Sequence, residues 1–146
     1  MKYQHVEAGE LIERVNRFIA RVRINGREET VHVKNTGRCK ELMVANAKVY
    51  LAKSSNPERK TAYDLVAVEK GDLLINMDSQ APNQAVGEWL KKKELFPDLV
   101  SVRPETVYGN SRFDFMIETG QGKVFLEVKG VTLEDNGQVS FPDAPS

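Results

Sequence analysis

The 146-residue sequence has little of several residue types that define sites and locations. A single cysteine, Cys39, excludes an internal disulfide. The two histidines, His5 and His32, are far apart and have no cysteine near them at ligand spacing, so a zinc site is not expected. No apolar run approaches the roughly 18 residues of a membrane helix, and no signal-peptide pattern is present. We therefore expect a protein of the reducing cytoplasm with no membrane segment.

The sequence also lacks an excess of charge of one sign, because 21 Lys and Arg balance 21 Asp and Glu. The totals thus point neither to a polyanion nor to a membrane surface. The distribution is uneven, however: residues 1–60 hold 13 basic against 7 acidic residues, and residues 61–146 hold 8 against 14. With 40% hydrophobic residues the chain can form a globular core. An anionic partner is expected to bind the N-terminal part.

The clearest local signal in that part is Asn25-Gly26, the preferred two-residue type I′ hairpin turn. Apolar residues in 11–22 also have helix-like spacing. We nevertheless predict a β-hairpin, because apolar residues alternate on both sides of the turn. If Ile24 pairs with Arg27, one face of the hairpin is basic and Arg23 lies across from Glu28. We predict that this face binds DNA, through Arg17, Arg21, Arg23 and Lys34, with His32 on the same face.

Three further runs have strand composition, at 48–53, 62–69 and 72–77. With the hairpin they give five short strands in residues 1–80. Five short strands that close on themselves predict an OB-like barrel, a fold that often binds nucleic acid. An unspecified small β-domain with ordinary solvated charges remains the alternative.

A second domain is predicted for residues 81–146, after the linker-like segment 79–83. Asn83 is placed to cap a helix whose apolar face holds Val86, Trp89 and Leu90. We then expect a strand near 106–108, two strands within 111–130, and a last hairpin at 131–141 that turns on Asn136-Gly137.

The two strands within 111–130 carry an unusual set of charges, Asp114 on the first and Glu127 and Lys129 on the second. Side chains two apart on a strand share a face, so Glu127 and Lys129 lie together, opposite the apolar face expected for Phe113, Phe115 and Val128. If the strands pair, both carboxylates converge on one hard cation and Lys129 reaches what that cation binds. Such a site suits phosphodiester hydrolysis. A solvated strand face is the open alternative.

Specific strings along the chain resemble a known family. The order of helix, strand, strand with Asp, and strand with Glu-x-Lys resembles the PD-(D/E)xK nucleases, and nearly the whole chain is similar to the sugar fermentation stimulation protein A family. The matching strings include VKNTGR at 33–38, SSNPERKTAY at 54–63, APNQAVGEWL at 81–90, YGNSRFDF at 108–115, LEVKGVTL at 126–133 and FPDAP at 141–145.

The resemblance implies an α+β, mainly β chain: an OB-like five-stranded barrel, then a partial restriction-endonuclease-like α/β domain. It implies non-specific DNA binding, a regulatory link to maltose metabolism, and catalytic positions at Asp114, Glu127 and Lys129. Asp114 and Glu127 would bind Mg²⁺ or Mn²⁺, with Glu88 as a further acid, although a helix carboxylate near Lys91 to Lys93 also suits a surface ion pair.

Three functions stay open: a DNA binder with a vestigial site, an active metal-dependent deoxyribonuclease, and an oligosaccharide-binding barrel. DNA is the expected partner, no small-molecule cofactor is evident, and an oligomer is compatible with the sequence. Family members continue beyond FPDAP, so the resemblance also implies that the nuclease-like domain is incomplete at its C-terminal end.

Overall fold

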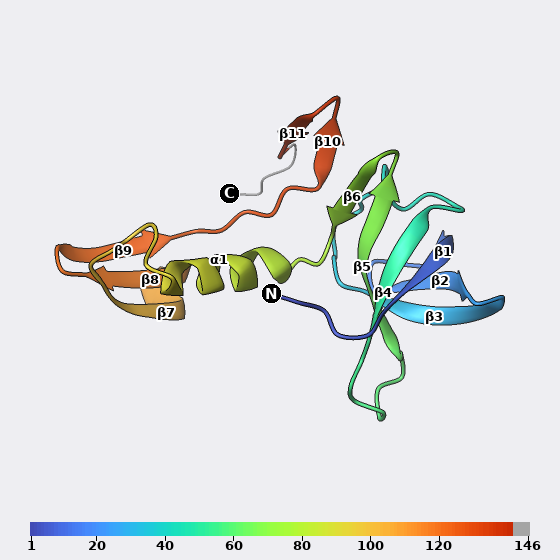
Figure 1. The fold of residues 1–146 in the computed structure, drawn as a ribbon, viewed down its shortest axis with the longest axis horizontal. Coiled ribbons are helices and arrows are strands. Elements are labelled where there is room, and N and C mark those ends of the chain that lie inside the picture. Colours follow the sequence, from blue (N-terminus) through green and yellow to red (C-terminus); the bar gives the residue numbers. More distant parts are fainter. Residues whose placement is uncertain (142–146) are drawn as a thin grey trace. The chain divides into compact units, whose positions relative to one another are not determined.

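The computed structural model describes residues 1–141, in which eleven strands and one helix form (Figure 1). The chain divides into two compact units by its contacts. One, the barrel unit, comprises residues 2–79 together with 131–141 of the described range. The other, the sheet unit, comprises Met1 and Gln80–Gly130. In the described range, no helix is long and apolar enough to cross a membrane.

The barrel unit is built on five strands that close on themselves. They are β1 (Val6–Arg14), β2 (Ile19–Ile24), β3 (Arg27–Val33), β4 (Lys48–Lys53) and β5 (Tyr63–Lys70). Neighbours in the order β3-β2-β1-β4-β5 pair antiparallel, and a parallel pairing of His32 with Asp64 and of Val33 with Leu65 joins β3 to β5. Closure removes the exposed edges of the sheet. The predicted OB-like five-stranded barrel is confirmed.

The strands that make the barrel differ from the predicted five at one place. β1 was not predicted, whereas the predicted strand at 72–77 is β6 (Leu73–Asn76), which extends β5 outside the closed ring. The sequence does not predict β1, because only Leu11 of this strand is fully buried. Its charged residues leave no alternation of apolar and polar residues. Gly9 of β1 lies so close to β2 that a Cβ at this position would be 2.8 Å from the carbonyl oxygen of Arg23.

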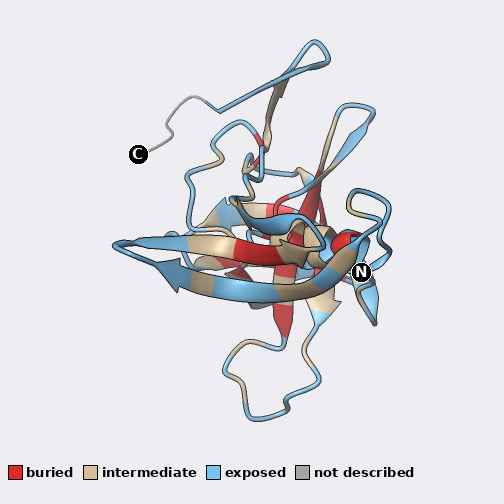
Figure 2. Cartoon of the chain, turned by 90° about the vertical axis from the view of Figure 1, so that its left-hand side faces the viewer, coloured by how far each residue is buried: buried red, intermediate tan, exposed pale blue. Residues whose placement is uncertain are grey.

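The core of the barrel follows the alternation of the hairpin. Ala20, Val22 and Ile24 of β2 are fully buried, while Arg21 and Arg23 between them point outward. Asn25 and Gly26 both have positive φ, as a type I′ turn requires, and Ile24 pairs with Arg27 as predicted. Figure 2 shows the buried residues gathered in the strands and the exposed residues in the loops and hairpin tips.

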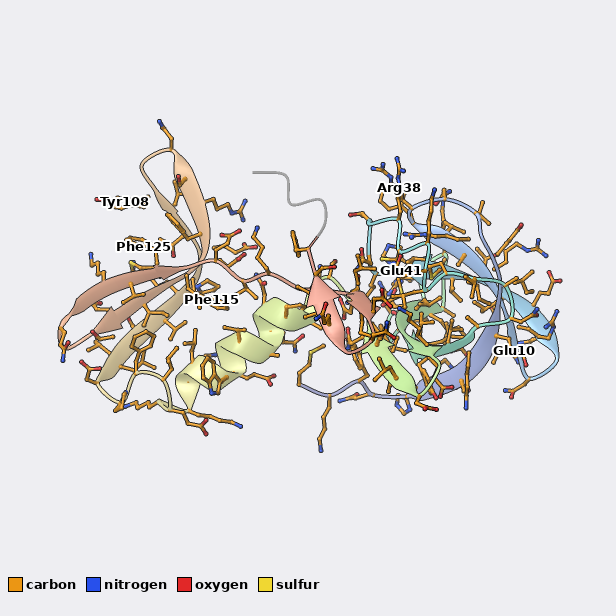
Figure 3. The ribbon with its side chains drawn as sticks, turned by 90° about the horizontal axis from the view of Figure 1, so that it is seen from above. Glu10, Arg38, Glu41, Tyr108, Phe115 and Phe125 are labelled. Carbon is orange, nitrogen blue, oxygen red and sulfur yellow. The ribbon has the colours of Figure 1, made fainter. Side chains whose placement is uncertain are left out.

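The sheet unit packs helix α1 (Ala81–Lys91) on one face of an antiparallel sheet of three strands. The strands, in the order β7-β8-β9, are β7 (Leu99–Tyr108), β8 (Ser111–Thr119) and β9 (Gly122–Leu126). Leu90 of the helix and Phe115 and Ile117 of β8 form the buried centre. Phe115, labelled in Figure 3, lies against the helix at Gly87, where a Cβ would come within 3.3 Å of its ring.

Several local predictions for this unit need correction. Asn83 does not cap the helix, because the N-cap is Gln80 and Pro82 lies in the first turn. Trp89 is 40% exposed rather than part of the apolar face. Phe113 is not part of the core that the sheet forms with the helix. Its ring instead contacts that of Phe125, with 5.0 Å between the ring centroids. The predicted strand at 106–108 is the end of a longer one, hidden in the sequence by Pro104.

The predicted last hairpin forms as β10 (Leu133–Asp135) and β11 (Gln138–Ser140), around Asn136-Gly137 with positive φ. By its contacts it groups with the barrel unit: Lys70 Nζ lies 3.6 Å from Glu134 Oε2 and also bonds the Glu134 carbonyl. The sequence predicted that this hairpin belongs to the 81–146 domain. The domain boundary itself stays a prediction.

Candidate functional site

Asp114 is the best-positioned acid of the predicted site. It is half-buried in β8, and each carboxylate oxygen accepts one hydrogen bond. Asn83 Nδ2, in the first turn of α1, donates to Oδ1 at 2.9 Å, and the backbone amide of Val128 donates to Oδ2 at 2.6 Å. Both contacts leave lone pairs on the carboxylate. Asp114 is therefore fixed by the helix and by the segment after β9.

Glu127 and Lys129 lie in that segment, which leaves the sheet after Leu126 rather than continuing as a strand. The predicted side-by-side placement is nevertheless found, because Lys129 Nζ lies 3.1 Å from Glu127 Oε1 and both side chains are exposed. Between them, Val128 packs into the core with Leu126. Gly130 then passes so close to the helix that a Cβ would lie 2.8 Å from Pro82 Cγ. The segment 127–130 is thus held at both ends.

The backbone register brings Asp114 beside Glu127. Phe115 pairs with Leu126, and the amide of the residue after Glu127 binds Asp114. Asn83 is the residue of this site that sequence reasoning missed as a partner of Asp114. Its position in the sequence could have indicated this role. One helix face, at the spacing i, i+3, i+4, i+7, holds Asn83, Val86, Gly87 and Leu90, and this is the face that covers the sheet.

Glu88, the third predicted metal ligand, has a different partner. It forms an ion pair with the N-terminal ammonium of Met1. It follows Gly87, which contacts Phe115, and one residue turns a helix by about 100°, away from the face that covers the sheet. The structure places Asp114 against the backbone next to Glu127, and Lys129 against Glu127. Glu88 is in an ion pair, as the alternative had it, but with Met1 and not with Lys91 to Lys93.

The residues present fit a hard divalent cation held by few protein ligands. Asp114 and Glu127 supply carboxylate oxygens, which Mg²⁺ and Ca²⁺ prefer, and Mg²⁺ is often bound through one or two carboxylates with the remaining ligands from water. Residues 1–141 contain no group of three or more His, Cys, Asp or Glu side chains arranged around one point. The donor set therefore suits an open, oxygen-only site rather than a closed zinc site.

The predicted basic face of the barrel carries more acids than the sequence indicated. Arg21 is paired with Glu13 at 3.0 Å and with Glu28, and Arg23 lies 3.3 Å from Glu10. Glu10 and Glu13 belong to β1, whose register sets them opposite Arg23 and Arg21. Because β1 was not predicted, its acids were not counted. The cationic character of this face is largely compensated.

Lys34 and Arg17, the other two predicted DNA contacts, differ from each other. Lys34 Nζ lies 3.6 Å from Asp78 Oδ2, and that carboxylate side chain is 1% exposed, so Lys34 balances a buried charge. Tyr3 also donates to Asp78, at 2.8 Å. Arg17 lies in the turn between β1 and β2 with its side chain exposed. Of the four predicted cations, Arg17 is the one most available to an external anion.

Comparison with known proteins divides the chain close to residue 80 and, unlike the division by contacts, keeps the last hairpin with the second part. Residues 12–77 match the model of the SfsA N-terminal OB domain, and residues 80–146 match that of the sugar fermentation stimulation protein RE domain. The chain belongs to the sugar fermentation stimulation protein family. Homologues so named are 57% identical in Clostridium beijerinckii and 56% identical in Ruminiclostridium cellulolyticum, over the whole of this chain.

The chain spans 65% of the length of these two family members. Among solved structures it is similar to Pyrococcus furiosus SfsA, described as a complex with Ca²⁺. The two share 30% sequence identity with a TM-score of 0.83, and the match covers all of this chain and 63% of the other.

Proposed function

We propose that this chain belongs to a DNA-binding protein with a divalent-cation site at Asp114 and Glu127, in which Lys129 lies beside the bound phosphate. The observation that carries the proposal is the fixed carboxylate of Asp114, held by Asn83 and Val128 next to the Glu127–Lys129 pair. A surface ion pair alone does not explain why an acid is anchored there by two donors from two elements. DNA as the partner also accords with the cytoplasmic location expected from the sequence.

Each residue has a distinct part in this proposal. Asp114, already oriented, supplies a carboxylate that needs little reordering when a cation binds. Glu127 is exposed and supplies the second carboxylate, which frees the Lys129 ammonium from its present partner. The Lys129 ammonium can then bind a phosphate oxygen, or position the water that attacks the phosphorus. The cation supplies neutralisation of the negative charge on the phosphodiester.

The structural relative supports the choice of metal class. Pyrococcus furiosus SfsA was solved in complex with Ca²⁺, a cation that takes oxygen ligands. Mg²⁺ and Mn²⁺ share that preference, and we propose them as the functional ions because phosphoryl transfer commonly uses them. We further propose that DNA binding is how the family is connected with sugar fermentation, through regulation of the genes concerned.

Two outcomes are open for the bound DNA, hydrolysis or binding alone. Lys129 beside Glu127 suits hydrolysis, because a carboxylate that holds a cation and an ammonium near the phosphate would both offset the negative charge that develops during cleavage. An oligosaccharide-binding barrel has weaker support: the strand tyrosines Tyr50 and Tyr63 both donate their hydroxyls to acids, Glu69 and Glu7, rather than forming an open stacking surface.

The test is a cleavage assay on supercoiled plasmid with Mg²⁺ or Mn²⁺. We expect nicking by the wild type that is lost in Glu127→Gln and Lys129→Met and retained in Glu88→Gln. If the wild type binds DNA but does not nick it, the regulatory function is supported and the nuclease activity is excluded. Nicking retained in Glu127→Gln would assign the activity to another site.

A further inference from the structure

One guanidinium organises two loops at one end of the barrel. The Arg14 side chain, at the end of β1, donates to five backbone carbonyls, two in the β1–β2 turn and three in the segment after β3. The acceptors are Asn16 at 3.1 Å, Arg17 at 2.8 Å, and Asn35, Gly37 and Arg38 at 2.6 Å each. Residues 15–18 and 35–40, here called the Arg14 loop pair, are thereby fixed beside one another.

The Arg14 loop pair carries cationic side chains that lack acid partners. Arg17, Arg38 and Lys40 are exposed, and in the described part of the chain none of them forms an ion pair. The acid next to them in sequence is Glu41. Figure 3 shows Arg38 at the periphery of the barrel unit. Arg14 adds a fourth positive charge that is satisfied by carbonyls and not by a carboxylate.

Arg14 links the backbones of the residues that carry these charges, because it donates to the carbonyls of both Arg17 and Arg38. Burial lowers the pKa of Arg14, Cys39 opposes this effect, and the neighbouring charge of Arg17 lowers the pKa further. Arg21 and Arg23, by contrast, are compensated by Glu10, Glu13 and Glu28. Lys53 and Lys60, at the end of β4 and in the β4–β5 loop, are also exposed and without an ion pair in the described chain, but they stand apart from the Arg14 loop pair in sequence. The Arg14 loop pair holds three such cations on two loops that Arg14 joins, and an anion approaching it meets them together.

An exposed aromatic ring completes the surface. Phe18 follows Arg17 directly and is 55% exposed, although its backbone is fixed by bonds to Asn16 and Val33. Exposed aromatic rings among cations are the combination with which barrels of this type bind single strands, because a base stacks on the ring while the cations contact the phosphates. A duplex offers no unpaired base to such a ring.

We propose that the Arg14 loop pair binds single-stranded DNA, with Arg17, Arg38 and Lys40 at the phosphates and Phe18 stacked on a base. This inference rests on the proposed DNA-binding function and deepens it, since it names the form of DNA and the surface. Because Arg14 holds both loops before DNA arrives, little ordering is required on binding.

The test is fluorescence anisotropy of the full chain with labelled single-stranded and duplex oligonucleotides of the same sequence, over a range of salt concentrations. Arg38→Ala/Lys40→Ala should weaken single-strand binding by roughly 10-fold or more and flatten the slope of log affinity against log salt by about 1.4. The control, Lys91→Ala/Lys92→Ala at the C-terminal end of α1, changes the net charge equally and should leave both values near wild type.

Phe18 is tested separately, because stacking and charge have different signatures. Phe18→Leu should lose roughly 10-fold in affinity with an unchanged salt slope, and Phe18→Tyr should retain binding. Melting curves establish that each variant is folded.

Three results would overturn parts of the proposal. If Arg38→Ala/Lys40→Ala binds single strands as tightly as the control variant does, the Arg14 loop pair is excluded as the binding surface. The DNA-binding function itself would still stand. Preference for duplex, with no effect of Phe18→Leu, would exclude the single-stranded form. Absence of binding to both forms by the wild type would overturn the DNA-binding function itself.

Discussion

Asp114 Oδ2 accepts a hydrogen bond of 2.6 Å from the backbone amide of Val128, which ties β8 to the segment that carries Glu127 and Lys129. The same carboxylate accepts from Asn83 in α1. An acid expected from the sequence to be a ligand thus also joins three elements of the sheet unit. Its structural and its proposed metal-binding roles need separate tests.

Asn83→Ala isolates the structural role. It removes one donor to Asp114 and leaves the carboxylate in place, so the free energy of unfolding should fall by about 1 kcal/mol. Urea denaturation of the variant and the wild type measures the change. Gln84→Ala is the matched control, because Gln84 is the next, exposed helix residue and its removal should cost little. Equal losses in the two variants would contradict a specific role for the Asn83–Asp114 bond.

Arg14→Lys tests whether one guanidinium organises the two loops. Lysine keeps the charge but offers three donors in place of the planar fork that reaches five carbonyls. We expect a loss of roughly 2 to 3 kcal/mol in unfolding free energy. Arg17→Lys, whose side chain is exposed, should change stability by less than about 0.5 kcal/mol. A stable Arg14→Lys variant would mean that the carbonyls are satisfied by water.

Lys34→Met addresses a residue that sequence reasoning assigned to DNA. The substitution deprives the buried Asp78 of its cation while Tyr3 still donates to it, so we expect a loss of roughly 1 to 3 kcal/mol. Lys40→Met serves as the exposed control for stability. If Lys34→Met instead leaves the urea midpoint unchanged and flattens the salt slope of DNA binding, the original assignment is correct and the present one is not.

The acid limit of barrel stability should depend on Asp64. Burial raises the pKa of its carboxyl, but the hydrogen bond and charge of Arg59, with Lys34 and His32, outweigh burial and leave the pKa below the ordinary value of 3.8. The ionised Asp64 carboxylate therefore contributes its full stabilisation above its ordinary pKa of 3.8. This stabilisation is lost as the pH falls through the lower pKa that the group has in the folded state.

Asp64→Asn is the variant that reveals this contribution. The difference in unfolding free energy between wild type and Asp64→Asn should be largest above about pH 5 and shrink below the ordinary value. Urea titrations at a series of pH values measure it, and Glu58→Gln on the neighbouring exposed loop is the control. A difference that is constant from neutral to acid pH would show that the charge of Asp64 does not matter.

The sequence predicted those features that depend on strong local patterns. The register of β2 and β3 followed from Asn25-Gly26 and the alternation around it, and Glu127 and Lys129 share a side as their spacing required. β1 was missed because a strand with one buried residue has no apolar alternation, and its acids changed the charge of the predicted DNA face. Asn83 was misassigned because a capping residue and an inward-facing one look alike until the helix start is known.

Trp89 allows cation binding at the proposed site to be measured in the unit that contains the site. Trp89 is the single tryptophan of the chain and lies on α1, so its fluorescence follows unfolding of the sheet unit. A cation that binds only the folded unit raises the melting temperature in proportion to the logarithm of its concentration, with about 2.7 kcal/mol gained at 100 times the dissociation constant.

The decisive measurement is the melting temperature followed by Trp89 fluorescence, with and without Mg²⁺, in the wild type, Glu127→Gln and Glu88→Gln. Glu127 is the informative ligand, because its side chain is exposed and removing its charge does not disturb the bonds of Asp114. We expect a rise of several degrees in the wild type and in Glu88→Gln, and no rise in Glu127→Gln. An equal rise in all three proteins, or none in any of them, would contradict the proposed site.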